Sequence, residues 1–224
     1  MKAFGVRDVA EFTTRLIELR AQLDPPSTSG EFVAYTDGAC FGNPSGNGGW
    51  AAIVFQGSNA WRLFGHLTST SNNRAEALGV LAALEWVPAG SRLRLHSDSE
   101  LTVRQLAGRY KIKANTDIWD LIQLTRGEKG IELLPEWVRG HAGDPLNELA
   151  DRLSKLGATN GTLDDFDAVD VSPPAEPPEL QGVTPRTDWE RDFVTSLRDQ
   201  LRRGRSLSDK QQAVLQRMRA RGAG

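Results

Sequence analysis

The sequence predicts an α/β protein in which helices cover a mixed β-sheet. Three strand-like segments, at residues 32–40, 48–57 and 60–68, are separated by the turn signals NPSGNGG and QGSN, which favours an antiparallel meander. From residue 71 to residue 158, helical and strand-like patterns alternate. Because strands joined through helices lie parallel in a sheet, this order predicts further strands added to the meander and helices on its faces.

Length and composition are those of a globular protein with one sizeable core. Of the 224 residues, 39% are hydrophobic and 25% are charged. No apolar run approaches the roughly 20 residues that span a bilayer, so no membrane contact is expected. The single cysteine, Cys40, cannot form an internal disulfide, and the N-terminus lacks the apolar centre of a secretory signal. We expect a cytoplasmic protein that is a monomer.

A helical pattern precedes the first strand. Its apolar residues recur near the helical period, at Val9, Phe12, Leu16, Leu19 and Leu23. The stretch DPPSTSG then ends the pattern, because two prolines followed by small polar residues cannot continue a helix. Residues 1–30 are therefore predicted to be an N-terminal helical extension and linker.

The elements of the core domain, residues 31–158, continue after the meander. A helix is predicted in SNNRAEALGVLAALEWV, with Ser71 or Asn72 as its N-cap, and is followed by a strand in RLRLHSD and a helix in SELTVRQLAG. Another helix in IWDLIQLTRG and a strand in IELLPEWVRG come next. The last helix begins at Asp144, with Pro145 in its first position. The tryptophans of this domain are predicted to be core residues: Trp50, Trp61, Trp86, Trp119 and Trp137.

Charge changes sharply after the core domain. Residues 160–185 hold six acids and no base, and SPPAEPP marks residues 159–187 as an acidic, proline-rich linker. Residues 188–224 have helical spacing in two segments, the second capped by Ser208, and are predicted to form a small basic helical hairpin. Three roles remain open for it: a solvated hairpin, a nucleic-acid clamp or a protein-docking element.

Four carboxylates mark a possible metal site. Asp37 and Asp98 end two predicted strands, while Glu76 and Asp151 lie on two helices, and none has an obvious neighbouring base. If the first and fourth strands are adjacent and parallel, Asp37 and Asp98 emerge at the same edge of the sheet. Carboxylates this close repel one another and require cations, and oxygen ligands favour Mg²⁺ or Mn²⁺. Two such ions, roughly 3.5–4 Å apart, can clamp a phosphodiester during hydrolysis.

In this order the motifs resemble those of type I ribonuclease H. They are YTDGACFGNP, SNNRAEA, HSDSE and WVRGHAGDPLNELAD, within residues 32–157. The resemblance implies a five-stranded mixed sheet flanked by helices and cleavage of the RNA strand of RNA–DNA hybrids. It also implies that the four carboxylates, Asp37, Glu76, Asp98 and Asp151, are catalytic metal ligands. The expected reaction uses two Mg²⁺ ions, with Mn²⁺ as a substitute, and leaves 5′-phosphate and 3′-hydroxyl ends.

The resemblance extends to side chains outside the metal quartet. His141, in the GHAG loop, corresponds to a family histidine that assists proton transfer or product departure. Ser71 falls where many members hold a threonine near a DNA-strand phosphate. A helix N-terminus and asparagine side chains suit hydrogen bonds to sugars and phosphates. The expected contacts to the hybrid are Cys40, Asn43, Ser71, Asn72, Asn73 and Arg74.

One departure from the family concerns affinity. Many bacterial members insert a basic, tryptophan-rich segment that grips the DNA strand, whereas this chain has only GRYKIKANTD, with Arg109, Lys111 and Lys113 as its bases. Residues 31–159 hold 14 acids and 13 bases, so weak intrinsic binding to the hybrid is expected. Residues 186–224 hold ten bases against five acids and are a candidate for an extra contact to nucleic acid or to a protein.

Two rival functions are considered. One is an inactive relative that only binds hybrids or partner proteins, which the four mutually repelling carboxylates argue against. The other is a DNA-cutting transposase or junction resolvase, which can share this architecture. The asparagines expected in the groove favour the hybrid-cleaving enzyme.

Overall fold

The computed structural model describes residues 4–140, 143–163, 177–202 and 205–221. The chain divides into two compact units, Met1–Pro173 and Pro174–Gly224, and each is described by itself. The division falls inside the predicted linker at residues 159–187. Within the described ranges, no helix combines the length and the apolar character needed to cross a bilayer.

The first unit is built on a five-stranded mixed sheet with the strand order β3–β2–β1–β4–β5, which confirms the predicted fold class. The first three strands form the predicted antiparallel meander. Strand β4 pairs with β1 in parallel, which meets the condition set for Asp37 and Asp98, and β5 pairs with β4 in parallel. The strands are β1 (Glu31–Cys40), β2 (Gly48–Gln56), β3 (Asn59–Leu67), β4 (Arg92–Ser97) and β5 (Glu132–Trp137).

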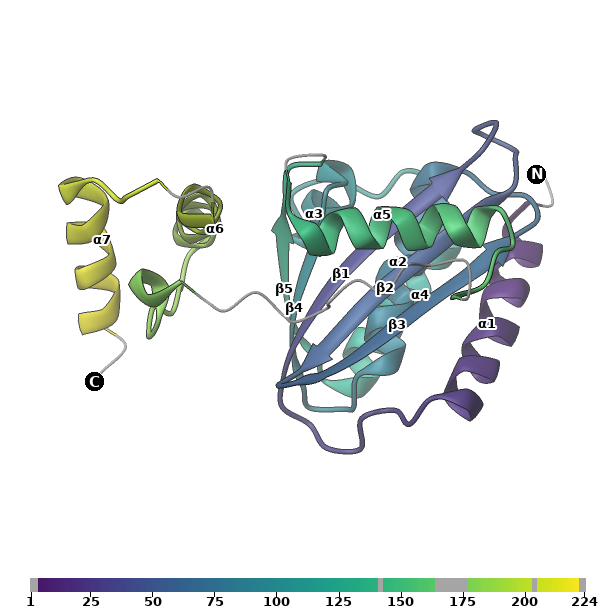
Figure 1. The fold of residues 1–224 in the computed structure, drawn as a ribbon, viewed down its shortest axis with the longest axis horizontal. Coiled ribbons are helices and arrows are strands. Elements are labelled where there is room, and N and C mark those ends of the chain that lie inside the picture. Colours follow the sequence, from purple (N-terminus) through teal and green to yellow (C-terminus); the bar gives the residue numbers. More distant parts are fainter. Residues whose placement is uncertain (1–3, 141–142, 164–176, 203–204, 222–224) are drawn as a thin grey trace. The chain divides into compact units, whose positions relative to one another are not determined.

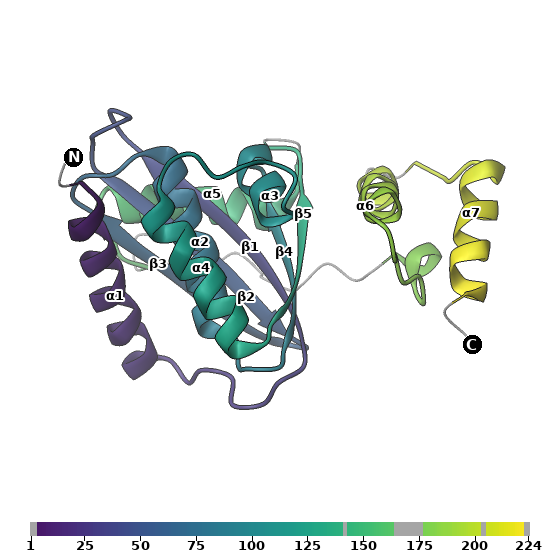
Figure 2. The same cartoon turned by 180° about the vertical axis from the view of Figure 1, so that it is seen from behind.

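Helices cover both faces of this sheet (Figures 1 and 2). Helix α5 lies across one face, over β1, β2 and β3, whereas α2 lies on the other face with α4 packed against it. Helix α1 packs beside β3 and α2, and α3 lies near β4 and β5. The helices are α1 (Phe4–Gln22), α2 (Asn72–Trp86), α3 (Glu100–Leu106), α4 (Thr116–Lys129) and α5 (Pro145–Ala158).

Local signals in the sequence set the helix ends. Ser71 is the N-cap of α2, and Asp144 is the N-cap of α5, where its carboxylate accepts hydrogen bonds from the backbone N–H groups of Leu146 and Asn147. Pro145 follows in the first turn, where its missing N–H costs nothing. These ends agree with the prediction because capping depends only on residues a few positions apart.

Two hydrophobic clusters fill the space on either side of the sheet. The larger lies between the sheet and helices α1, α2 and α4, and the smaller lies beneath α5. Helix α2 has buried residues around most of its circumference because the sheet covers one side and other helices cover the opposite side. The N-terminal helix, whose packing the sequence left open, joins the larger cluster, where Phe12 meets Trp50 edge to face with ring centroids 5.0 Å apart.

The prediction for the tryptophans was right for three of the five. Trp50, Trp86 and Trp119 are buried, and Trp61 is half-buried at the margin of the larger cluster. Trp137, expected in the core, is instead 40% exposed. It is the last residue of β5, an edge strand of the sheet, so no further strand covers it.

The second unit is small and helical, as predicted, but its core also includes Leu180, which lies in the segment predicted to be a linker. It contains a short 3₁₀ helix, η2 (Pro178–Leu180), and two α-helices, α6 (Asp188–Arg202) and α7 (Asp209–Ala220). Ser208 caps α7 in a capping box with Gln211. The unit has its own core, formed by Leu180, Val194, Leu197, Leu207, Leu215 and Met218.

Close packing of α5 on the sheet predicts a sharp contrast between two glycines. A methyl group at Gly49 of β2 would lie 2.1 Å from Ser154 O and 2.4 Å from Ala158 N, whereas one at Gly127 of α4 would meet nothing within 4 Å. We expect Gly49→Ala to lower the free energy of unfolding by about 1–3 kcal/mol. Gly127→Ala should raise it by about 1 kcal/mol because alanine favours the helix. Denaturant unfolding measures both, and equal effects would contradict this packing.

Candidate active site

Three carboxylates from three elements meet at one edge of the sheet. Asp37 lies in β1, Asp98 directly follows β4, and Glu76 lies near the start of α2. One carboxylate oxygen of each lies within 4.8 Å of the others. Strand β1 continues past Asp37 in its pairing with β2, but its parallel pairing with β4 ends at Tyr35 and His96. Asp37 and Asp98 therefore emerge side by side, two residues beyond the last pair.

Gly38 allows the third carboxylate to approach. A methyl group at this position would lie 2.1 Å from the backbone nitrogen of Glu76, so only glycine lets α2 pack this closely on β1. The close approach brings Glu76 beside Asp37, which precedes Gly38 in the chain. The glycine of the TDG motif, which lies within β1, thus has a packing role.

Burial makes these negative charges costly. Asp37 is 6% exposed and Glu76 is 9% exposed. Burial, together with the charges of Asp98 and Asp151, raises the pKa of Asp37 to about 6, against the opposing hydrogen bond from Ser154. Burial, and secondly the charge of Asp37, raises the pKa of Glu76 well above its ordinary value. Both carboxyl groups therefore favour a proton or a cation.

The cluster fits a divalent metal ion. Oε2 of Glu76 is buried and has no hydrogen-bond partner among the described residues, which is an unfavourable state for a carboxylate oxygen. A cation among the three carboxylates would satisfy this oxygen and offset the repulsion between the charges. The available donors are all carboxylate oxygens, which hard divalent cations prefer.

Asp151, the fourth predicted ligand, lies outside the group within 4.8 Å. Its Oδ2 accepts a hydrogen bond from Lys155 Nζ at 2.7 Å, one helical turn further along α5. No base was expected beside Asp151, which was wrong: residues four positions apart are neighbours on a helix, and Lys155 is that neighbour. The charge of Asp151 still contributes to the raised pKa values of Asp37 and Glu76.

Two residues of α5 that the sequence analysis missed hold the carboxylates in place. Asn147 Nδ2 donates to Asp98 Oδ2 at 3.1 Å, and the hydroxyl of Ser154 donates to Asp37 Oδ2. Both side chains are buried. They lie four residues before and three residues after Asp151, so the helical spacing in PLNELADRLS was the signal that could have found them.

The chain before the GHAG histidine also reaches the site. A methyl group at Gly140 would lie 2.8 Å from Oδ2 of Asp98, so the backbone at this point packs directly on that carboxylate. His141, the predicted proton-transfer residue, lies outside the described residues.

The predicted substrate contacts gather on two neighbouring loops, residues 41–47 and 68–71. Asn43 Oδ1 accepts a hydrogen bond from the backbone N–H of Asn72 at 3.2 Å. Cys40 Sγ, at the end of β1, lies 3.3 Å from the carbonyl oxygen of Thr70 and donates to it. The backbone N–H of Thr70 donates to Gly46 O at 3.1 Å, so the two loops are also bonded directly to each other and form one surface.

At the start of α2, three further predicted contacts follow one another. Ser71 caps the helix through its backbone conformation, and its side chain makes no capping hydrogen bond. Asn72 and Asn73 are exposed in the first turn. Five of the six predicted contacts, namely Cys40, Asn43, Ser71, Asn72 and Asn73, therefore lie in or beside the same loop pair.

Arg74, the sixth predicted contact, is placed differently and requires a correction. Its guanidinium is buried and donates to both carboxylate oxygens of Asp8, at 2.6 and 2.9 Å, and to both of Asp117, at 2.9 and 2.8 Å. These bonds use the donors that a phosphate would need. Arg74 joins α1, α2 and α4 and is no longer counted among the substrate contacts.

Comparison with known proteins identifies the family. Residues 29–159 match the family model described as RNase H. The chain belongs to the ribonuclease H family. The match covers the sheet and α2 to α5, and α1 and the second unit lie outside it. Membership confirms the resemblance seen in the sequence and makes the protein a hydrolase, a metal-dependent endoribonuclease.

Individual proteins agree with the family match. Ribonuclease H of Phenylobacterium zucineum is 37% identical over 141 residues, which are 57% of this chain and 90% of that protein. Ribonuclease HI of Caulobacter vibrioides is 36% identical over 137 residues, 55% of this chain and 89% of that protein. The N-terminal RNase H domain of a Mycobacterium tuberculosis protein, solved as a fusion with maltose-binding protein, has a TM-score of 0.52 at 26% identity, covering 58% of this chain and 94% of that chain.

The raised pKa of Asp37 predicts how stability depends on pH. Its pKa is about 6 in the folded protein against an ordinary 3.8, so its stabilising contribution is complete below about pH 4 and is lost as the pH rises through 6. Without divalent ions, the free energy of unfolding of the wild type relative to Asp37→Asn should fall by about 3 kcal/mol between pH 4 and pH 7. Denaturant unfolding in EDTA measures this difference.

The matched control is Asp120→Asn, because Asp120 is exposed on α4 and distant in sequence from the cluster. At neutral pH, Mg²⁺ should raise the melting temperature of the wild type and of the control but not that of Asp37→Asn. Parallel pH profiles for the wild type and Asp37→Asn would contradict the assignment of the raised pKa.

Proposed function

We propose that the protein hydrolyses the RNA strand of RNA–DNA hybrids with two Mg²⁺ ions, or Mn²⁺ in their place, and leaves 5′-phosphate and 3′-hydroxyl ends. The observation that carries the proposal is the meeting of Asp37, Glu76 and Asp98 within 4.8 Å in a chain of the ribonuclease H family. The proposed substrate is supported by LC11-RNase H1, a similar protein that was solved in complex with an RNA/DNA hybrid. It is 25% identical with a TM-score of 0.51 and covers 58% of this chain and 97% of that chain.

In this proposal Asp37, Glu76, Asp98 and Asp151 hold the ions. Bound divalent ions supply the positive charge that stabilises a phosphodiester during attack by water. The remaining residues orient the carboxylates: Asn147 and Ser154 each fix one oxygen by a hydrogen bond, and Lys155 holds Asp151. Because these supports lie on one helix and the sheet is rigid, the carboxylates are positioned before any ion binds.

The loop pair suits the minor groove of a hybrid, where 2′-hydroxyl groups distinguish RNA from DNA. Asn43 is fixed through its oxygen by the N–H of Asn72, which leaves its amino group as a donor. Asn72 and Asn73 stand exposed at the N-terminus of α2, where the helix dipole favours phosphate. His141 remains a proposed proton-transfer residue on the strength of the sequence.

Substitution of Asp98 tests the chemistry. Asp98→Asn keeps the size of the side chain and an oxygen that can accept from Asn147, but it removes one negative charge from the cluster. We expect cleavage of a labelled RNA–DNA hybrid in Mg²⁺ to fall by about 1,000-fold or more, with little change in melting temperature. Asp120→Asn should leave the rate unchanged.

Comparison of RNA–DNA, DNA–DNA and RNA–RNA duplexes in the same assay separates the rivals. Cleavage of the hybrid alone supports the proposal, whereas preferred cleavage of DNA–DNA would indicate a transposase-like or resolvase-like enzyme. Binding without cleavage would indicate an inactive relative. A folded Asp98→Asn variant with near wild-type activity would contradict the metal site.

We further propose that the second unit adds a contact to nucleic acid. Arg205, Lys210 and Arg217 are exposed on it. Trp189 is 61% exposed and stacks on Phe193 with ring centroids 5.1 Å apart, and exposed aromatic faces can stack on bases. Arg217 also donates to Ala213 O at 3.3 Å, within its own helix. Arg219 donates to the carbonyl oxygens of Glu179 and Gln181 and so binds within the unit.

Neutralising the exposed bases tests this contact. The triple variant Arg205→Gln, Lys210→Gln, Arg217→Gln should bind a hybrid more weakly, and the slope of log affinity against log salt should become shallower by about 1 to 3. Gln216→Ala, on the exposed surface of α7, is the control and should change neither quantity. An unchanged salt slope in the triple variant would contradict the contact and favour protein docking.

A further inference from the structure

Helix α1 lies outside residues 29–159, which match the family, yet it carries a fully buried carboxylate. Asp8 is 0% exposed. Its Oδ2 accepts hydrogen bonds from Arg74 Nε at 2.6 Å and from the hydroxyl of Thr70 at 3.2 Å, and its Oδ1 accepts from Arg74 Nη2 at 2.9 Å. A buried charge with three such bonds is held in one geometry.

One turn along α1, Glu11 binds the same connection. Its two carboxylate oxygens accept hydrogen bonds from the hydroxyl of Thr68 at 2.6 Å and from the backbone N–H of Thr68 at 2.9 Å. Together, Asp8 and Glu11 bind positions 68, 70 and 74, which lead from the end of β3 into the first turn of α2. The proposed substrate residues Ser71, Asn72 and Asn73 lie within this connection.

Thr70 connects α1 to the other loop of the proposed substrate surface, residues 41–47. Its hydroxyl donates to Asp8, its backbone N–H donates to Gly46 O at 3.1 Å, and its carbonyl oxygen accepts from Cys40 Sγ. The methyl group of Thr70 lies beside Gly48: a methyl group added at Gly48 would lie 2.3 Å from it. Thr70 is thus fixed on one side by α1 and on the other by residues 40–48.

Arg74 relates α1 to the carboxylate cluster. Residues two positions apart on an α-helix point roughly 200° apart, so Arg74 and Glu76 occupy nearly opposite sides of α2. Asp8 and Asp117 each hold the guanidinium through two oxygens on the side away from the sheet. These bonds fix the rotation of the first turn of α2, which sets the direction of Glu76 on the other side.

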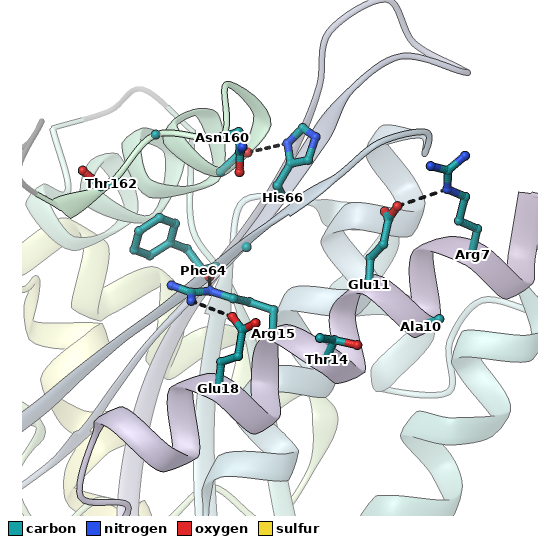
Figure 3. A pocket seen from close by; sticks show the side chains of 13 residues that line it. Arg7, Ala10, Glu11, Thr14, Arg15, Glu18, Phe64, His66, Asn160 and Thr162 are labelled. Carbon is teal, nitrogen blue, oxygen red and sulfur yellow. Dashed lines mark hydrogen bonds and ion pairs between the residues drawn. The ribbon is translucent and has the colours of Figure 1, made fainter.

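On its outer side, α1 borders a groove of about 700 Å³ that it shares with β3 and the chain after α5 (Figure 3). Arg15 donates there to Phe64 O at 3.2 Å and to Glu18 at 3.1 Å. Glu18 belongs to the same helix, but its side chain is 51% exposed. Among the described residues it pairs with Arg15, and it makes no bond to residues 68–74. It therefore offers a matched control for Asp8.

We propose that α1 is a positioning element of the substrate surface formed by the loops 41–47 and 68–71. Asp8, assisted by Glu11, holds residues 68–74 in the arrangement that binds the hybrid. The inference rests on the proposed function for the identity of the ligand. A helix that served only stability would alter the unfolding of the whole unit. A positioning helix also alters local order at residues 68–76 and hybrid affinity while the protein remains folded.

Two substitutions test the inference in the full-length protein. Asp8→Asn removes the charge that binds Arg74, and Thr70→Val removes only the hydroxyl while keeping the methyl group beside Gly48. Both are compared with Glu18→Gln at a temperature where circular dichroism shows each protein to be folded. The measurements are amide hydrogen exchange at residues 68–76 and equilibrium binding of an RNA–DNA hybrid in EDTA.

We expect both variants to exchange faster at residues 68–76 than the wild type, with exchange in α5 unchanged. Hybrid affinity should fall by about tenfold in Asp8→Asn and by less in Thr70→Val, since it loses only one bond. Glu18→Gln should match the wild type in both measurements.

Unchanged exchange at residues 68–76 or unchanged affinity in both folded variants would overturn the inference. If Asp8→Asn does not fold, Thr70→Val alone decides between these outcomes. A wild-type protein that neither binds nor cleaves the hybrid would instead overturn the proposed function, and hydrogen exchange would still show whether α1 orders the connection.

Discussion

The repulsion among three carboxylates, two of them buried and one half-buried, is the constraint on which the rest of the structure depends. Asp37, Glu76 and Asp98 have oxygens within 4.8 Å of one another, and burial already opposes the charge of the first two. Left to relax, such groups would separate or take up protons. The fold resists separation because Asp37 lies in β1, Glu76 lies in α2 and Asp98 directly follows β4. A divalent cation is the partner that makes their proximity favourable.

The two faces of the sheet contribute in different ways to this arrangement. From one face, α5 supplies the hydrogen bonds of Asn147 and Ser154 that orient the carboxylates of Asp98 and Asp37. From the other, α2 brings Glu76 against β1 at Gly38, where any larger residue would collide. Helix α5 also carries Asp151, and the first turn of α2 carries Asn72 and Asn73. The same two helices therefore position both the candidate metal site and the proposed substrate surface.

Arg74 shows why a basic residue in a recognition motif need not bind the substrate. Two carboxylates, from α1 and from the start of α4, take up its guanidinium and draw it into the interior. What remains for the hybrid at this end of α2 is backbone N–H groups, a hydroxyl and carboxamides. Such a surface selects by shape and hydrogen bonding more than by charge.

The sequence by itself determined the order of the elements, the caps at Ser71, Asp144 and Ser208, and the acids of the family motifs. These depend on periodicity and capping, which involve residues a few positions apart. The tertiary structure decided which groups pair: Arg74 with Asp8, 66 positions away, Asn147 with Asp98, 49 away, and Ser154 with Asp37, 117 away. It also decided the exposure of Trp137 on an edge strand. No local pattern contains such contacts, because they follow from which helix faces meet once the sheet is assembled.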